Sequence, residues 1–231
     1  MADSIRYVSS LPLSFLVLIV HDIGSPRYGQ CTRYLAGLKV GQKVTVSIKP
    51  SVMKVRVYNH LLLHGFAKMA FCSKLPPSDL QPLILAGLGT GAAPFRAFLQ
   101  HRALLASQGK PVGPLYYYFG SRYRSKEYLY GEEIEAFMLD KTITRAGLAF
   151  SRDGPKKVYI QHKMLEDAED LVRMLHKEKG VFYLCGPTWP VPDVYETLVK
   201  ALVKYNGFEE ITAGEYLEGL KEEERYVLEV Y

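Results

Sequence analysis

The sequence predicts an α/β protein in which a doubly wound parallel sheet follows part of a small antiparallel barrel. Two observations predict this class. From about residue 80 onward, apolar runs rich in β-forming residues alternate with segments that are apolar at helical spacing. Earlier in the chain, Val44, Val46 and Ile48 alternate with polar neighbours, as in a strand with one buried face. The domain boundaries that we expect are residues 1–54 for the partial barrel, 55–79 for an atypical insertion and linker, and 80–231 for the α/β domain.

The composition is ordinary for a globular chain and excludes few functions. Hydrophobic residues make up 48% of the 231 positions and charged residues 23%, enough for a real core. The formal charge of +5 is spread along the chain without a block of like charges, so we expect no nucleic-acid partner. The apolar run at 11–20 is too short to cross a bilayer, so we expect a buried strand there and no membrane association.

Three cysteines, Cys31, Cys72 and Cys185, are too few and too scattered for a disulfide framework or a zinc site. This usage suits a reducing compartment, and we expect a cytoplasmic protein. His60 and His64 have the spacing of metal ligands on a helix, but no third ligand lies near them in the sequence. We therefore predict no metal site.

The elements of the first part are read from local pattern. We expect a strand at 14–22, a turn region after it, a short helical piece at 31–38 and a strand at 41–52. Residues 55–74 follow neither the strand nor the helix period and contain no acidic residue, and "LPPSD" at 75–79 is typical of a linker.

The second part alternates between strands and helices in the order of a parallel sheet. The expected strands are 82–88, 114–121, 143–151, 157–161 and 181–186, and the expected helices are 93–107, 130–139, 162–180 and 191–207. The tail "EEERYVLEVY" has the alternation of an edge strand. It ends on Tyr231, an aromatic side chain that can cover a flat ring and swing away.

A glycine-rich turn joins the first of these strands to a helix. In "LILAGLGTGAAPFRAFL", Gly87, Gly89 and Gly91 allow a phosphate to approach the backbone, the helix start attracts its charge, and Thr90 adds a hydroxyl. Pro94 suits the first helical turn. Tight turns also use glycine for purely steric reasons, so the motif alone leaves both interpretations open.

A second group of donors lies in "SRDGPKKVYIQ". Ser151, Arg152, Lys157 and Tyr159 offer a hydroxyl, a guanidinium, an ammonium and a phenol, the donors that a phosphate monoester needs. On a strand, Lys157, Tyr159 and Gln161 would share one face. Arg122, at the end of the preceding strand, could join them. The alternative is a solvated edge strand with its usual lysines.

Cys185 closes the apolar strand at 181–186 and precedes a Gly-Pro turn. This position places its thiol at the carboxyl end of the sheet, where open α/β folds bind ligands. A buried cysteine can also act only as a small hydrophobic residue, and no histidine in the nearby sequence marks it as a nucleophile.

The motifs "GLGTGAAPFRAFLQ", "FGSRYRSKEYLYGEE", "SRDGPKKVYIQ", "YLCGPTWPVPD" and "RYVLEVY" occur in the order found in the ferredoxin–NADP reductase-like module of diflavin reductases. Residues 80–231 resemble this module almost without gaps. Within the family, the likeness is greatest to the flavoprotein component of NADPH sulfite reductase and to the flavoprotein end of pyruvate:NADP oxidoreductase.

The resemblance implies a role for each matched residue. The group that holds the adenosine 2′-phosphate and so selects NADPH over NADH is matched by Ser151, Arg152, Lys157, Tyr159 and Gln161. Thr90, followed by Gly91, matches the cofactor phosphate turn, and Asp193 matches a cofactor-contacting aspartate. Cys185 and Glu229 match the thiol and carboxylate beside the nicotinamide, and Tyr231 matches the aromatic stacked on the flavin.

The amino-terminal part resembles the end of the family's FAD-binding barrel. "RYGQCTRYL" is similar to the flavin pyrophosphate loop, which implies FAD contacts for Gly29, Gln30, Cys31 and Thr32. The family's Arg-x-Tyr-Ser flavin motif has no match in "DSIRYVSS", and this departure puts the retention of FAD by the chain in question. The rest of the barrel and the FMN-binding flavodoxin domain would precede Met1, so we expect the chain to be the carboxyl-terminal piece of a larger protein.

The resemblance implies an NADPH-dependent flavin oxidoreductase that moves hydride between NADPH and FAD for onward transfer, with an FMN-binding flavodoxin domain or a haem or iron–sulfur acceptor subunit as partner. Two alternatives stay open. Electrons could flow the other way, from pyruvate oxidation to NADP, or the chain could be an inactive NADP-binding fragment without stable FAD. Deleting 55–74 restores the ordinary family sequence, which suggests a translated intron or a lineage-specific loop.

Overall fold

The structure is a computed structural model that describes residues 19–22, 25–28, 34, 37–39, 42 and 75–231. In the first part, β1 (Ile19–Asp22) pairs with β2 (Ser25–Tyr28) as an antiparallel hairpin, with Ile19 opposite Tyr28. β1 lies within the strand expected at 14–22, whereas β2 occupies residues expected as a turn region. The expected strand at 41–52, the segment 55–74 and the two histidines within it lie outside the described residues, apart from Gln42.

The second part is built on a five-stranded sheet in which every pairing is parallel. Its strands are β3 (Leu83–Leu88), β4 (Leu115–Ser121), β5 (Arg145–Phe150), β6 (Val181–Gly186) and β7 (Tyr226–Val230), in the spatial order β5-β4-β3-β6-β7. Strand order runs outward from β3 to β5 and then restarts on the other side with β6. The predicted doubly wound α/β fold is confirmed, and the tail is the expected edge strand.

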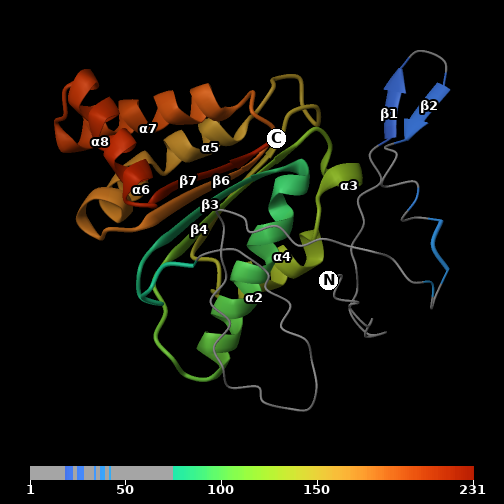
Figure 1. Ribbon diagram of the computed structural model, residues 1–231, viewed down its shortest axis with the longest axis horizontal. Helices are drawn as coiled ribbons and strands as arrows, with labels where there is room; N and C mark the ends of the chain where they lie inside the picture. Colours follow the sequence, from blue (N-terminus) through green and yellow to red (C-terminus); the bar gives the residue numbers. More distant parts are fainter. Residues whose placement is uncertain (1–18, 23–24, 29–33, 35–36, 40–41, 43–74) are drawn as a thin grey trace, which may run out of the picture. The chain divides into compact units, whose positions relative to one another are not determined.

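Helices cover both faces of this sheet (Figure 1). One face carries α2 (Ala93–Ser107) and α4 (Gly131–Leu139), and the other carries α5 (Ile160–Glu166), α6 (Ala168–Val172), α7 (Val191–Asn206) and α8 (Glu210–Glu222). Three short helical turns complete the domain: η1 (Gly89–Ala92) after β3, α3 (Arg124–Glu127) after β4 and η2 (Arg173–Lys177) after α6.

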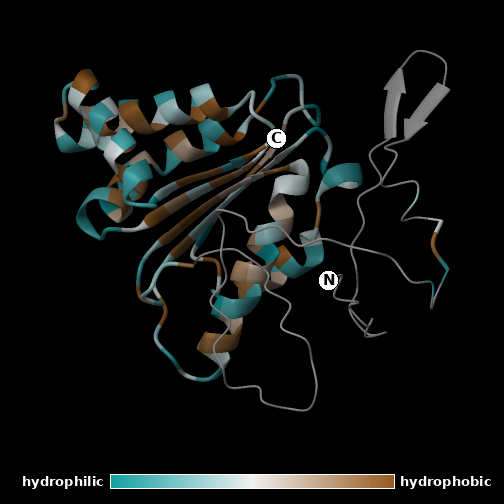
Figure 2. Ribbon diagram, in the orientation of Figure 1, coloured by the Kyte–Doolittle hydropathy of each residue, from teal (hydrophilic) through white to brown (hydrophobic). Residues whose placement is uncertain are grey.

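The two faces give two hydrophobic cores, because side chains alternate across each strand. Leu83 and Leu85 of β3 pack with Phe98 of α2, while Ile84 and Ala86 pack in the core beneath α5 to α8. All six residues of β3 are buried, as expected for a central parallel strand. Hydrophobic positions are accordingly frequent along the strands, whereas the helices mix hydrophobic and hydrophilic positions (Figure 2).

The predicted strand at 157–161 is wrong. Residues 151–156 form turns and bends, and Tyr159 immediately precedes helix α5. The backbone N–H of Tyr159 donates to Nδ1 of His162, in the first turn of that helix, at 3.1 Å. Ile160 and Met164 are four residues apart and fully buried. Residues at this spacing share one face of a helix, so their burial favours a helix over a strand. Ile160 packs over Gly120, where a β-carbon would lie 2.8 Å from its Cγ2 atom.

The structure differs from the expected elements in three further places. The helix expected at 162–180 is divided among α5, α6 and η2. Helix α8 was not predicted; it buries Ala213, Leu217 and Leu220. Leu75, assigned to the linker, is 6% exposed and packs in the core beneath α2.

Candidate functional site

The candidate site lies at the carboxyl ends of the parallel neighbours β3 and β6, where the chain leaves the two strands toward opposite faces of the sheet. The connection after β3 leads to α2 on one face, and the connection after β6 leads to α7 on the other. Such a switch point leaves an opening between the two connections, and open α/β sheets bind ligands there. The chain's carboxyl terminus lies at this same end of the sheet (Figure 1).

The two connections pack closely, and glycine makes this possible. A β-carbon on Gly91 would lie 1.9 Å from the carbonyl oxygen of Cys185, and one on Gly186 would lie 2.9 Å from Cβ of Leu88. Gly186 also has φ of 145°, a conformation that other residues rarely adopt. The steric interpretation therefore holds for Gly91, and it brings the phosphate turn against the end of β6.

The start of helix α2 can accept an anion. Among the described residues, no side chain caps its N-terminus and its first turn holds no acidic residue, while Pro94 occupies the first turn as predicted. The first N–H groups of a helix lack partners within it and carry a positive partial charge. A phosphate group on the η1 turn would satisfy these groups.

The carboxyl-terminal residue closes this opening. The N–H of Tyr231 donates to the carbonyl of Gly186 at 3.1 Å, and its phenol forms a hydrogen bond with the hydroxyl of Thr90 on the phosphate turn. The Tyr231 side chain is nevertheless 66% exposed. It is therefore held by a few polar contacts at a surface and can be displaced.

Cys185 and Glu229 are neighbours across the sheet, because β6 and β7 pair in parallel with these two residues in register. Cys185 is 5% exposed. Burial, together with the carboxylate of Glu229, raises the pKa of the Cys185 thiol to about 12. The thiol is therefore neutral near pH 7 and is not the thiolate that a covalent nucleophile requires.

Gln161 and Asp193 join the starts of helices α5 and α7. Nε2 of Gln161 donates to Oδ2 of Asp193 at 3.0 Å, so these two predicted contacts of the cofactor are brought together. Gln161 is 9% exposed, and within the described part of the chain its Oε1 atom accepts no hydrogen bond. A buried acceptor without a donor is costly, which marks a place for a ligand donor or a water molecule.

The predicted donors for a phosphate follow the end of β5. The N–H groups of Ser151 and Arg152 extend the pairing with β4, at 2.9 Å from the carbonyls of Ser121 and Arg122. The rest of the loop, residues 152–157, is exposed. Arg152 and Lys157 are exposed, and no ion pair is found for either among the described residues. Since β5 lies two strands from β3, the ends of these two strands are about 10 Å apart across the sheet.

Arg122 differs from these two cations because it is already paired. Its Nε donates to Glu127 at 2.9 Å, and its backbone N–H donates to the same carboxylate at 2.8 Å. Partial burial opposes ionisation of Glu127, but the hydrogen bonds from Arg122 outweigh it and lower the pKa of the carboxyl. Glu127 was not predicted from the sequence, and the four-residue spacing from Tyr123 to Glu127 in "RYRSKE" is the only signal of its helical turn.

Trp189 also belongs to this end of the sheet and was not predicted. It lies in the connection from β6 to α7, is 58% exposed and meets Tyr159 with ring centroids 6.2 Å apart. The signal in the sequence is an aromatic residue held between prolines in "GPTWPVP". The FAD-related residues Gly29, Gln30, Cys31 and Thr32 lie outside the described part of the chain.

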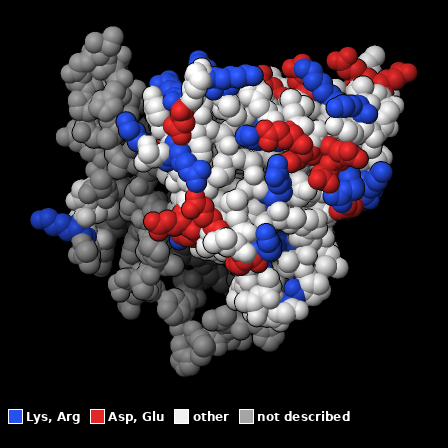
Figure 3. All heavy atoms as spheres, turned by 180° about the vertical axis from the view of Figure 1, so that it is seen from behind, with Lys and Arg blue, Asp and Glu red and all other residues white. Residues whose placement is uncertain are grey.

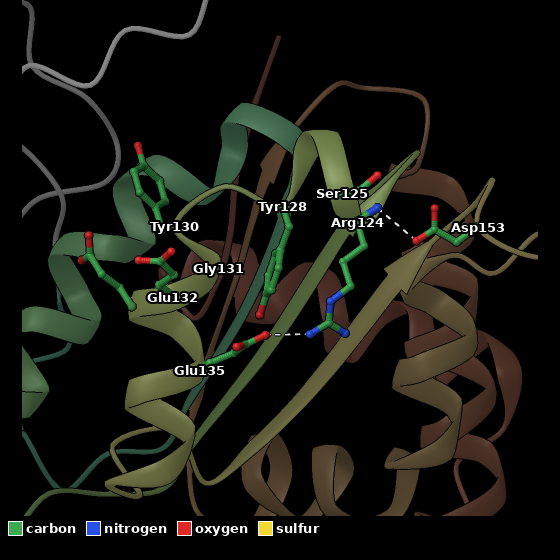
Figure 4. A pocket seen from close by; sticks show the side chains of 9 residues that line it. Arg124, Ser125, Tyr128, Tyr130, Gly131, Glu132, Glu135 and Asp153 are labelled. Atoms are coloured by element: carbon green, nitrogen blue, oxygen red, sulfur yellow. Dashed lines mark hydrogen bonds and ion pairs between the residues drawn. The ribbon is translucent and has the colours of Figure 1, made fainter.

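A separate open cavity of about 930 Å³ lies beside α3 and α4 (Figure 4). It is lined by Arg124, Ser125, Tyr128, Tyr130, Gly131, Glu132, Glu133, Glu135 and Asp153. Arg124 is bound by Glu135 at 2.6 Å, and its backbone N–H donates to Asp153 at 3.0 Å. With four carboxylates and one paired arginine the cavity suits no phosphate, so we place the candidate site at the switch point.

Charge is mixed on the face of the described part that Figure 3 shows. Figure 3 shows basic and acidic side chains interspersed over one face. The described residues contain no group of three or more metal-ligating side chains and no helix with the length and hydrophobicity of a membrane span. The case for an anionic ligand therefore depends on the local placement of Arg152 and Lys157.

A parallel sheet with a glycine turn at its switch point defines the class of α/β dinucleotide-binding domains. Comparison with known proteins agrees: residues 84–191 match the family model for an oxidoreductase NAD-binding domain. Through this domain the chain is homologous to the ferredoxin–NADP reductase-like diflavin reductases.

Individual relatives support this assignment. The chain is 43% identical over 215 residues to the sulfite reductase [NADPH] flavoprotein component of Saccharomyces cerevisiae, covering 92% of this chain and 19% of the relative. It is 44% identical over 219 residues to a probable protein of the same name from Schizosaccharomyces pombe, covering 94% and 20%. NADPH–cytochrome P450 reductase of Cavia porcellus is 38% identical over 159 residues, covering 68% and 24%. The chain thus spans about a fifth of the length of its first two relatives.

Proposed function

We propose that this chain is the NADP(H)-binding module of a flavoprotein oxidoreductase that moves hydride between NADPH and FAD for onward electron transfer. The observation that carries the proposal is the pair of exposed cations Arg152 and Lys157 at the same end of the sheet as the glycine turn. NADPH has a 2′-phosphate that NADH lacks, and a dianion needs such donors. The printed names of the relatives include NADPH and a flavoprotein component, which supports the same cofactors here.

The residues of the chain would divide the work of placement. The η1 turn and the start of α2 would receive the pyrophosphate, with Thr90 adding a hydroxyl. Ser151, Arg152, Lys157 and Tyr159 would bind the 2′-phosphate, with Arg122 contributing less because Glu127 already neutralises it. Gln161 and Asp193 would meet the cofactor between the starts of α5 and α7.

The end of β6 and the tail would form the reactive part of the site. When bound, the nicotinamide and flavin rings supply the hydride exchange itself. Cys185 offers an uncharged side chain, and the Glu229 carboxylate favours the positive charge of an oxidised nicotinamide. Tyr231 would cover the flavin ring and leave its contact with Thr90 when NADPH enters.

The partner is proposed from the same family. We propose an FMN-binding flavodoxin domain, or a haem or iron–sulfur subunit, as the acceptor of electrons, and a cytoplasmic location. FAD would be held through Gly29, Gln30, Cys31 and Thr32, while FMN would belong to a domain upstream of this chain.

The test is a cofactor analysis of the purified chain. Yellow protein that reduces ferricyanide with NADPH supports the complete proposal. Colourless protein that binds 2′,5′-ADP supports the NADP(H) site and shows that this chain does not retain FAD. Protein that neither reduces ferricyanide with NADPH nor binds 2′,5′-ADP contradicts the proposed function.

A further inference from the structure

Arg124 joins the loop after β5 to helices α3 and α4. Its backbone N–H donates to Oδ2 of Asp153 at 3.0 Å, and its guanidinium donates to Glu135 of α4 at 2.6 Å. The carbon at the centre of the same guanidinium lies 5.8 Å from the ring centroid of Phe150, the last residue of β5. Figure 4 shows Arg124 between Glu135 and Asp153. One arginine therefore contacts the chain at both Phe150 and Asp153.

These two contacts bracket two of the proposed phosphate donors. Ser151 and Arg152 are the residues between them, and the N–H groups of both donate to carbonyls at the end of β4 at 2.9 Å. Packing is loose beyond Asp153: apart from its chain neighbours, a β-carbon on Gly154 would meet one described atom within 4 Å, a carbonyl oxygen at 4.0 Å. Residues 151–153 are therefore the part of the loop that is held in place.

The charge of Asp153 is unfavourable for a phosphate site. A carboxylate next to Arg152 in the chain repels a dianion that binds there, so on charge alone its removal would strengthen binding.

The hydrogen bond of Asp153 acts in the opposite direction. Tyr123, the N-cap residue of α3, makes no side-chain hydrogen bond to the helix, and the Asp153 carboxylate is the acceptor for the N–H of Arg124. Without this acceptor the turn that presents Ser151 and Arg152 would gain conformational freedom. Donors that must first be ordered bind a ligand more weakly.

We propose that Asp153 is a positioning residue of the 2′-phosphate site. Its carboxylate binds the N–H of Arg124 and thereby holds Ser151 and Arg152 where the phosphate meets them. The inference rests on the proposed function. Asp153 acts through these two donors and needs no contact with the ligand, and the order that it gives the turn outweighs the repulsion that it adds.

Two substitutions separate the hydrogen bond from the charge. Asp153→Asn removes the charge and keeps an oxygen that can accept the N–H of Arg124, whereas Asp153→Ala removes both. Calorimetry measures the Kd of each intact chain for 2′,5′-ADP and for 5′-AMP, which lacks the 2′-phosphate. Amide hydrogen exchange at Arg124 reports the hydrogen bond itself.

We expect Asp153→Ala to weaken 2′,5′-ADP binding roughly tenfold, with little change for 5′-AMP and with faster exchange at Arg124. Asp153→Asn should bind 2′,5′-ADP at least as tightly as the unaltered chain and keep the slow exchange. Asp140→Ala is the matched control, because Asp140 also accepts a backbone N–H in a turn, from Thr142 at 2.8 Å, but precedes β5 at the opposite end of the strand. It should leave both Kd values unchanged.

The contrary results are equally specific. Tighter binding of 2′,5′-ADP by both Asp153 variants would show that only the charge matters, and equal weakening in both would show that the asparagine oxygen cannot replace the carboxylate. Either result, or an unchanged Kd for Asp153→Ala, would overturn the inference. Absence of 2′,5′-ADP binding to the unaltered chain would contradict the proposed function itself.

Discussion

Arg122 and Arg152 occupy equivalent ends of neighbouring strands but differ in what neutralises them. The Arg122 guanidinium is bound to Glu127 at 2.6 Å, whereas Arg152 is exposed and projects from a turn. A phosphate that approaches Arg122 must compete with a carboxylate, while one that approaches Arg152 or Lys157 competes only with water. Selectivity for a 2′-phosphate is therefore expected to depend on the loop after β5.

The first prediction concerns these two cations. Replacing Arg152 and Lys157 with alanine should weaken NADPH binding by a factor of roughly 100 or more, the loss of two charge-assisted contacts, and should change NADH binding little. Arg173→Ala is the matched control, since Arg173 is a surface cation at the start of η2 that is paired with Asp170 of α6. Calorimetric titration of both cofactors measures the effect, and an equal loss for NADPH and NADH would contradict the assignment.

The exposure of Trp189 could not be predicted from the sequence. Composition and period cannot distinguish an exposed aromatic from a buried one, and only its exposure and its contact with Tyr159 reveal the difference. By contrast, Cys185 and Tyr231 could be placed from sequence, because each lies next to the carboxyl end of a strand and parallel strands end at one edge.

At the scale of elements, the closeness of the η1 turn to β6 decides the geometry of the site. Gly91→Ala should displace the turn, because its β-carbon would overlap the carbonyl of Cys185 at 1.9 Å. We expect loss of 2′,5′-ADP binding and a lower free energy of unfolding. Calorimetry and urea unfolding measure the two effects.

Gly219→Ala is the matched control for that substitution. Gly219 lies within helix α8, and apart from its chain neighbours and the backbone of its own helix no described atom lies within 4 Å of its added β-carbon. Alanine favours the helix, so the free energy of unfolding should rise by about 0.5–1 kcal/mol with binding unchanged. If Gly91→Ala behaved like this control, the turn would not be packed as described.

The strand wrongly predicted at 157–161 shows the limit of short patterns. Val158 and Ile160 alternate with polar residues over only five positions, which also fits the start of a helix. Once β5 ends, burial of Ile160 and Met164 on the sheet favours the helix. The donors Lys157 and Tyr159 therefore come from a loop and a helix start instead of one strand face, although they remain beside Ser151 and Arg152 in the chain.

At the scale of the whole molecule, the described α/β unit combines two cores with many buried tyrosines. Longer patterns made the sheet, the crossover helices and the switch point predictable, because near-continuous apolar strands and amphipathic helices repeat several times. Helix α8 was missed because glutamates and glycines dilute its apolar period. The sequence does not reveal that Glu127 pairs with Arg122 or that Arg152 is exposed, since both depend on the turns that follow the strands.

Stability should fall in alkaline solution. Burial raises the pKa of Cys185, Tyr116 and Tyr128 to about 12, and raises the pKa of Tyr117 and Tyr118 further. In the unfolded chain the side-chain pKa is about 8.5 for cysteine and about 10 for tyrosine. The unfolded state thus loses protons first, and the stabilisation present below about pH 8 declines as the pH rises toward about 12.

Urea unfolding between about pH 8 and about pH 11 measures this decline, which should reach several kcal/mol. Exposed tyrosines such as Tyr205 and Tyr231 should ionise before unfolding, whereas the tyrosinate absorbance of the buried phenols should appear together with it. A free energy of unfolding that stays constant over this range would show that these side chains are accessible to solvent.

The central claim is that the loop after β5 recognises the 2′-phosphate of an adenine nucleotide. The most direct measurement compares the calorimetric Kd of the intact chain for 2′,5′-ADP and for 5′-AMP at the same ionic strength. We predict that 2′,5′-ADP binds roughly 100-fold more tightly and that added salt reduces this advantage. Equal affinities for the two nucleotides would contradict the claim.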